Sequence, residues 1–353
     1  MTTPPRQEWQ FGMIYTPDEP WLAKAAPEPV LDPELPIVDP HHHLWQRGDH
    51  RYFLDGLLAD LGTGHNIVAT VFLECRSMYR ADGPPELRPV GETEFVAGIA
   101  AMSDSGAYGT TRVAAGIVGY ADLTLGDRVE PVLEAHLRAG GGRFRGLRHS
   151  AGWDADPVIG NSRPDMQPHL YQRPNFREGL ARLTRLGLSF DAWLYHPQLA
   201  DIVELARAFP STIIVMGHIG GVLGYGPYAG KSAEVMPAWR RSMAELAQCP
   251  NVVVKIGGMI NRGAAYDFHS VPAPPSSEVM AEVWRPYVET CVELFGPNRC
   301  MFESNFPVDK MGIGYKALWN AFKRIVRAAS PDEKRALFAG TATRAYRLEY
   351  PGS

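Results

Sequence analysis

Residues 35–45 have the sequence LPIVDPHHHLW, and the prediction of the fold begins with this stretch. Its apolar first part predicts a buried β-strand over Leu35–Pro40, and three histidines follow directly. In an extended chain, residues two positions apart point to the same side. We therefore expect the imidazoles of His41 and His43 to project together from the carboxyl end of this strand, a pairing that suits a metal ion such as Zn²⁺.

Seven further short segments, rich in β-branched residues and bounded by glycine, proline or polar residues, also predict strands. They are Ile67–Glu74, Arg112–Gly119, Arg143–Arg148, Leu188–Leu194, Thr212–Gly217, Asn251–Ile256 and Cys300–Glu303. Several are continuously apolar, which is typical of parallel strands buried on both faces. Apolar residues at spacings of three and four predict helices at Glu92–Ser103, Asp127–Ala139, Phe176–Leu186, Gln198–Ala208, Glu234–Ala247 and Glu278–Leu294.

The alternation of strands and helices predicts an α/β fold, a (β/α)8 TIM barrel. An open doubly wound sheet is the structural alternative, but no glycine-rich phosphate loop follows the first strand. Two long loops, Ser150–Arg173 and Gly257–Ser277, follow predicted strands, so we expect them to shape a pocket at the catalytic face. Met311–Ser353 is expected to form the eighth helix and a C-terminal helix, with Pro331 at a helix start.

The predicted domain organisation is one barrel domain, residues 35–353, preceded by an N-terminal extension, residues 1–34. The extension is rich in proline and charged residues, for example in EPWLAKAAPEPVLDPEL. We expect it to wrap the outside of the barrel or to pack near its mouth.

The composition is that of a soluble globular protein that acts on a small-molecule substrate. The 353 residues are 45% hydrophobic and 21% charged, with a formal net charge of -4. This small charge favours neither nucleic acid nor a membrane as a partner, and a homodimer is compatible with the sequence. The four cysteines form no CxxC pair, and neither a signal-peptide pattern nor a membrane-spanning apolar run is found, so a cytoplasmic location is expected.

Polar side chains follow several of the other predicted strands. Glu74 ends the second strand, Arg148 and His149 the fourth, and His196, His218 and Asn305 follow the fifth, sixth and eighth. Each of them has a simpler explanation on its own, such as a salt bridge at the rim or, for His196, a position near a helix start. In a barrel, however, the carboxyl ends of all strands meet at the one face where active sites lie, so together these residues predict an active site.

These motifs resemble those of amidohydrolase family 2, the metal-dependent TIM-barrel hydrolases that include sugar lactonases and the pyrone-dicarboxylate lactonase. The resemblance runs from about Leu35 to the C-terminus. It is carried by IVDPHHHLW (37–45), RFRGLRH (143–149), LSFDAW with His196 (188–196), IIVMGHIGG (213–221) and MFESNFP (301–307).

The resemblance implies roles for individual residues. It implies that His41 and His43 are metal ligands on the first strand, and that His196 is a further ligand on the fifth. It also implies that His218 lies next to the reacting group and that Arg148 contacts a carboxylate or a lactone oxygen of the substrate.

One residue departs from the pattern of the family. Relatives carry Ser-Asp-Trp-Pro at the eighth strand, where the Asp is a metal ligand and general base, whereas this chain has Ser304-Asn305-Phe306-Pro307. An amide cannot take up a proton near neutral pH, and it is a poorer ligand for Zn²⁺ than a carboxylate. The base could then be His218, Glu74 or Asp309, or the metal could be weakly bound or absent.

The predicted function is hydrolysis of a lactone or related cyclic ester in a small acidic or hydroxylated substrate. The expected cofactor is a divalent metal, Zn²⁺ first, with His41, His43 and His196 as ligands. The expected catalytic residues are His218, Asn305 and Glu74, and the expected substrate-binding residues are Arg148, His149 and Trp45. Two alternatives stay open, namely a decarboxylase or hydratase of the same superfamily and a binding protein that has lost the eighth-strand Asp.

Overall fold

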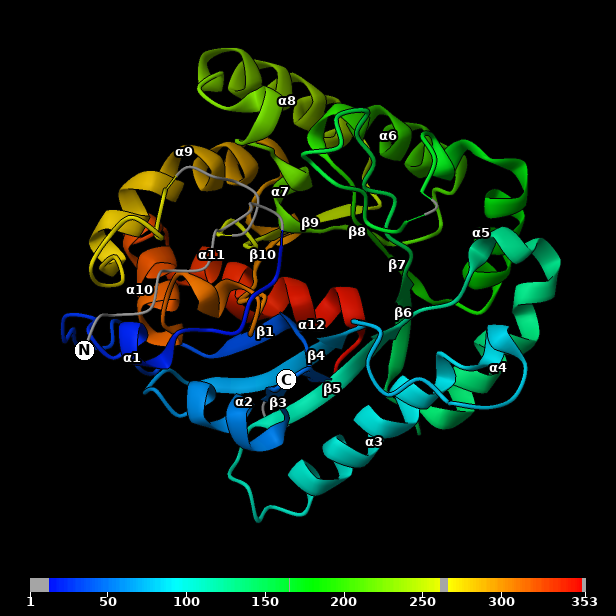
Figure 1. Cartoon of the computed structure of the whole chain (residues 1–353), viewed down its shortest axis with the longest axis horizontal. Coiled ribbons are helices and arrows are strands. Elements are labelled where there is room, and N and C mark those ends of the chain that lie inside the picture. Colours follow the sequence, from blue (N-terminus) through cyan, green and yellow to red (C-terminus); the bar gives the residue numbers. More distant parts are fainter. Residues whose placement is uncertain (1–12, 165, 261–265, 351–353) are drawn as a thin grey trace.

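The computed structural model describes residues 13–164, 166–260 and 266–350. Eight parallel strands follow one another in the order β1-β4-β5-β6-β7-β8-β9-β10 and curl into a barrel (Figure 1). Their bounds are Ile37–His42 (β1), Ile67–Leu73 (β4), Arg112–Gly119 (β5), Phe144–Arg148 (β6), Ser189–Ala192 (β7), Ile214–Met216 (β8), Val252–Ile256 (β9) and Cys300–Phe302 (β10). The predicted (β/α)8 barrel is confirmed, and each predicted strand is present.

The barrel closes between β1 and the segment after β10. The backbone N–H of His43 donates to Phe306 O at 2.8 Å, and that of Asn305 donates to His41 O at 2.9 Å. Strand β1 is irregular, with a register shift against β4 between Asp39 and His42, because Pro40 has no N–H to donate. The strand nevertheless continues two residues beyond its predicted end, which keeps the histidines at the rim of the barrel.

Most of the helices surround the barrel, whereas the last one, α12, crosses the centre of the ring of strands in this view (Figure 1). The helices are Glu19–Leu22 (α1), Leu54–Leu61 (α2), Val90–Asp104 (α3), Glu130–Ala139 (α4), Pro174–Arg185 (α5), Leu199–Ala208 (α6), His218–Gly221 (α7), Ser232–Ala247 (α8), Ser277–Phe295 (α9), Tyr315–Ile325 (α10), Pro331–Arg335 (α11) and Thr341–Tyr346 (α12). The predicted helix from Asp127 instead starts at Glu130, because Leu123–Val129 forms a 3₁₀ turn and Pro131 occupies the first turn of α4. Pro331 begins α11, as predicted.

A short hairpin between β1 and β4 was not predicted. It consists of β2 (Trp45–Arg47) and β3 (His50–Tyr52), which pair in antiparallel fashion. Gly48 in its turn has a φ of 55°, a conformation that glycine adopts without strain. The hairpin continues directly from the histidine segment, so it brings its own side chains close to the mouth of the barrel.

The described part of the N-terminal extension packs against the barrel. The indole N–H of Trp21 donates to Val271 O at 3.1 Å, and Lys323 Nζ donates to Leu31 O at 2.8 Å. Ile14 reaches the mouth of the barrel and lines the pocket there. The boundary between residues 34 and 35 stays a prediction. Among the described residues, no helix is both long enough and apolar enough to cross a membrane.

Candidate active site

A pocket with a cavity volume of about 270 Å³ opens at the carboxyl ends of the strands. Five residues predicted for the site line it: His43, Glu74, Arg148, His218 and Asn305. The barrel thus brings together side chains that are far apart in the sequence, at the face where barrel enzymes carry out their chemistry.

The three consecutive histidines divide between two environments. His41 and His43 lie side by side, with their Nε2 atoms 3.2 Å apart, as their spacing predicts. His42 points the other way, where its Nε2 lies 2.8 Å from Thr70 Oγ1 and its ring packs against Phe72. The outer two histidines therefore face each other at the pocket, and the middle one packs into the barrel wall.

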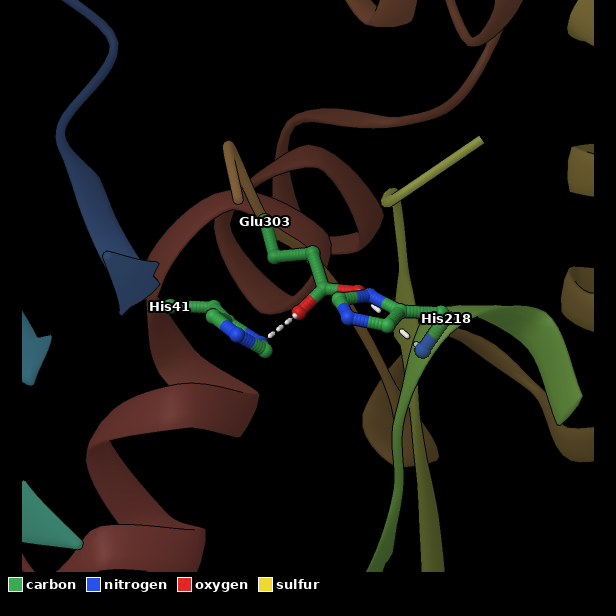
Figure 2. Close-up of side chains that lie close together, drawn as sticks. All are labelled: His41, His218 and Glu303. Carbon is green, nitrogen blue, oxygen red and sulfur yellow. Dashed lines mark hydrogen bonds and ion pairs between the residues drawn. The ribbon is translucent and has the colours of Figure 1, made fainter. Parts of the chain in front are cut away.

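Glu303 joins His41 to His218 (Figure 2). Its Oε2 lies 2.6 Å from His41 Nδ1, and its Oε1 lies 2.7 Å from His218 Nδ1. Glu303 is fully buried. Burial alone would raise the pKa of this carboxyl, but the two imidazoles that it contacts hold its pKa well below the usual value. Glu303 is therefore a buried carboxylate that accepts from both rings.

These contacts fix the tautomers of the histidines. Because Glu303 can only accept, Nδ1 of His41 and of His218 must carry the hydrogen. His43 Nδ1 lies 2.9 Å from Leu73 O, which also only accepts. Burial lowers the pKa of both His41 and His43 well below the ordinary value, so neither ring takes a second proton. The two Nε2 atoms that face each other therefore both lack a hydrogen, and each carries a lone pair.

Two facing lone pairs repel each other unless a donor or a cation interacts with them. Arg148 Nη1 lies 3.4 Å from His41 Nε2, and a divalent metal would interact with both nitrogens, so this geometry also fits a divalent metal. Zn²⁺ binds imidazole nitrogens at about 2.0–2.1 Å, and two such ligands at a tetrahedral angle are then about 3.4 Å apart. The observed separation of 3.2 Å is close to this value. His41, His218 and Glu303 also form a group whose potential ligand atoms all lie within 4.8 Å of one another.

Arg148 and Glu74 form an ion pair on the wall of the pocket. Arg148 Nε donates to Glu74 Oε1 at 2.9 Å, and Arg148 Nη2 donates to Glu74 O. Arg148 Nη1 also lies 3.4 Å from His41 Nε2. Glu74 is thus largely engaged by the guanidinium, while Arg148 keeps donor capacity at the position where the histidine lone pairs meet.

Asn305 lies beside the histidines and is oriented by Asp309. Its side-chain N–H donates to Asp309 Oδ1 at 2.9 Å. Burial raises the pKa of Asp309 to about 8, although the hydrogen bond from Asn305 acts in the opposite direction. Because the amide nitrogen is bound to Asp309, Asn305 presents its carbonyl oxygen as the group available to the pocket that it lines.

Asp39 fixes the position of the histidine segment relative to the end of β10. Its Oδ1 accepts from Ser304 N at 3.0 Å and from His41 N at 3.3 Å. Its Oδ2 accepts from Ser304 Oγ at 2.5 Å and from Tyr315 Oη at 3.0 Å. Burial raises the pKa of Asp39 to about 6. One buried carboxyl thus holds together the two segments that carry His41 and Asn305.

Three residues predicted for the site lie elsewhere. His196 Nδ1 accepts from Leu223 N at 3.3 Å, and the residue lines a different pocket, next to Tyr228. His149 Nδ1 accepts from Leu123 N at 3.3 Å. Trp45 is buried and stacks on His43, with ring centroids 5.6 Å apart. None of the three lines the central pocket, and their roles as ligand or substrate contact stay predictions.

Glu303 was not predicted as a functional residue, although the sequence contains a signal for it. Glu303 is the last residue of Cys300–Glu303, the segment predicted as the final strand, and the carboxyl ends of barrel strands lie at the catalytic face. The glycines after β9 add a second signal. A Cβ on Gly257 would lie 2.4 Å from Glu303 Cγ, so only glycine leaves room for this side chain.

We expect Glu303→Gln to weaken Zn²⁺ binding by about 10–100-fold, the usual effect of losing a carboxylate that orients metal-binding histidines. The Gln amide can accept from only one ring, so the other loses its acceptor or changes tautomer. Titration of Zn²⁺ against a chromogenic chelator measures the affinity, and imidazole ¹⁵N shifts report the tautomers. Glu289→Gln, which removes a carboxylate from a surface pair with Arg285, is the control. Equal Zn²⁺ affinity in both variants would contradict the assigned role.

Comparisons with known proteins identify the family of the chain. A family model of amidohydrolases matches residues 38–348. The chain is 34% identical over 338 residues to the uncharacterized protein y4mH of Sinorhizobium fredii, covering 89% of this chain and 99% of that protein. It is 26% identical to an L-fucono-1,5-lactonase of Burkholderia ambifaria, covering 89% and 96%.

A solved structure of an amidohydrolase from Burkholderia multivorans with bound zinc has the same fold. Its TM-score is 0.67 at 23% identity, over 89% of this chain and 99% of that one. The chain therefore belongs to amidohydrolase family 2, as its motifs predict.

Proposed function

We propose that the protein hydrolyses a lactone or related cyclic ester of a small acidic or hydroxylated molecule, with a divalent cation, Zn²⁺ first, held by His41 and His43. The observation that carries this proposal is the pair of facing Nε2 lone pairs, 3.2 Å apart. The relatives named as L-fucono-1,5-lactonases support the reaction class. A cation held there would supply Lewis-acid polarisation of the ester carbonyl.

Three side chains of this protein would carry out proton transfer, stabilisation of the carbonyl oxygen and orientation of the water. With Nδ1–H bound to Glu303, His218 turns Nε2 toward the pocket, where it can take a proton from water and return it to the leaving alkoxide. Arg148 donates to the carbonyl oxygen as it gains negative charge. Asn305, held by Asp309, offers its carbonyl oxygen to a hydrogen of the attacking water.

Zinc content and product analysis together test the proposal. We expect protein purified without chelator to contain one divalent ion per chain by elemental analysis. We also expect it to release one proton per δ-lactone consumed, because ester hydrolysis forms a carboxylic acid, and dialysis against a chelator should reduce this rate.

The same assay separates the alternatives. Incubation with a panel of aromatic acids, with CO₂ release as the measured quantity, tests for a decarboxylase. CO₂ formation without lactone hydrolysis would overturn the proposal in favour of the decarboxylase. Metal-free protein with no turnover on either panel would contradict it and favour a binding protein.

A further inference from the structure

Two arginines on the wall of the pocket have no carboxylate partner among the described residues. Arg47 and Arg76 both line the pocket that holds His43 and His218. Arg47 Nη2 donates to Cys75 O at 2.7 Å, and Arg76 Nη2 donates to Ser162 O at 3.4 Å. Each guanidinium therefore donates to one backbone carbonyl and has further N–H groups that can donate to a ligand.

Both arginines are exposed at the pocket, and local contacts support each of them. The guanidinium carbon of Arg47 lies 4.1 Å above the ring of Trp45, which stacks in turn on His43. Arg76 has a φ of 61°, a left-handed conformation that is uncommon outside glycine.

The surrounding loop holds that strained conformation in place. Oε1 of the buried Glu92 accepts from Cys75 N at 3.0 Å and from Ser77 N at 2.7 Å, the residues on either side of Arg76. These two hydrogen bonds hold the backbone on either side of Arg76, and its side chain lines the pocket.

The charge of the pocket lining is unbalanced. Arg47, Arg76 and Arg148 line it, whereas Glu74 is its single acidic residue among those described and is already paired with Arg148. Arg47 and Arg76 are therefore two positively charged side chains of the lining that have no ion-pair partner among the described residues. The Ser162 hydroxyl, beside the carbonyl that Arg76 contacts, is buried and lacks a partner among the described residues.

We infer that Arg47 and Arg76 form a subsite for an anionic group of the substrate, a carboxylate or a phosphate, separate from the ester that reacts at the histidines. The planar guanidinium fork matches the oxygens of either anion. The inference rests on the proposed function for the identity of the reacting group, but not for the binding of the anion. The proposed function left the substrate either acidic or hydroxylated, and this subsite selects the acidic class.

Binding of simple anions tests the subsite without any turnover. We expect glutarate, inorganic phosphate or both to bind the wild-type protein in calorimetric titrations, more weakly as NaCl is raised. Arg47→Gln and Arg76→Gln should each weaken binding by about tenfold, the effect of losing one charge-assisted hydrogen bond. Arg51→Gln is the matched control, because Arg51 belongs to the same hairpin and stacks on Phe53 but does not line the pocket.

The two anions identify the preferred ligand, and a kinetic comparison tests the role in substrate selection. We expect a carboxylated δ-lactone to have a kcat/KM at least about tenfold above that of its methyl ester, with the preference lost in the Arg47→Gln/Arg76→Gln double variant.

Different outcomes overturn different proposals. Equal anion binding in wild type and double variant, or no anion binding at all, would overturn the subsite. Arginine-dependent anion binding without hydrolysis of either lactone would instead uphold the subsite and overturn the proposed function.

Discussion

His41→Ala is expected to reduce kcat/KM for ester hydrolysis by at least about 10³-fold, because it removes one of the two facing lone pairs and one partner of Glu303. Zn²⁺ content should fall with it. Steady-state kinetics and elemental analysis measure both quantities, and circular dichroism checks the fold. His41→Gln retains a donor that can reach Glu303, so it serves as a second variant if the alanine variant unfolds.

The neighbouring residue provides a matched control. His42→Ala removes a buried ring that contacts Thr70 and Phe72 rather than the pocket. It should lower the free energy of unfolding by about 2–4 kcal/mol, through a cavity and a lost hydrogen bond, while the folded fraction keeps its Zn²⁺ and its kcat/KM. Full activity in His41→Ala, or an equal loss of specific activity in His42→Ala, would refute the assignment of the outer histidines to the chemistry.

The order of the barrel elements could be predicted because parallel strands buried on both faces produce continuous apolar segments. The hairpin of β2 and β3 could not, because three-residue strands such as Trp45–Arg47 are too short to show a period of two. Strand β7 ends at Ala192, short of the predicted Leu194, because Trp193 O accepts from Ala151 N in the loop after β6. Local sequence carries no information about that distant donor.

The candidate site could be predicted where a residue directly follows a strand. His43, His218 and Asn305 meet in one pocket because each lies within a few residues of a barrel strand. His196 lies four residues beyond β7, after the chain has turned into a 3₁₀ turn, and the direction of that turn depends on contacts such as the one with Leu223. Closeness to a strand end is not sufficient, however, because His149 directly follows β6 and yet accepts from Leu123 N instead of lining the pocket.

A buried charged residue beneath the site supports the neutral state of His41. Lys255 is fully buried inside the barrel, and its Nζ donates to Asp191 Oδ1 at 2.9 Å. Tyr346 Oη donates to the same oxygen at 2.6 Å. Burial is the main cause of the low pKa of His41, and the positive charge of Lys255 lowers it further. The core of the barrel therefore helps keep His41 unprotonated, with its Nε2 lone pair free for a cation.

The second large effect is expected at Asn305. Replacing it by Asp introduces a carboxylate about 3 Å from the buried carboxyl of Asp309. Two carboxylates at this distance cannot both be ionised, so the pair must share a proton. We expect Asn305→Asp to lower the free energy of unfolding by about 2–4 kcal/mol at pH 8.

The sign of the pH dependence follows from the raised pKa of the pair. The folded state then binds more protons than the unfolded state above the ordinary carboxyl pKa of about 4, so stability falls as pH rises from there through the folded pKa. Wild type should already show a shallower form of this loss up to about pH 8, from Asp309 alone. Urea unfolding between pH 5 and pH 9 should therefore show that the free energy of unfolding falls more steeply with pH in Asn305→Asp than in wild type.

Exchanging the two residues isolates the cause. The double variant Asn305→Asp/Asp309→Asn again pairs one amide with one carboxylate, with the donor on the opposite side, so most of the lost stability should return. It also presents a carboxylate beside His41 and His43, so its Zn²⁺ affinity should exceed that of wild type. Asp309→Asn alone is the control, because it removes a carboxylate without adding one at position 305. If Asn305→Asp were as stable as wild type at pH 8, or the exchange failed to recover stability, the contact with Asp309 would not be what orients Asn305.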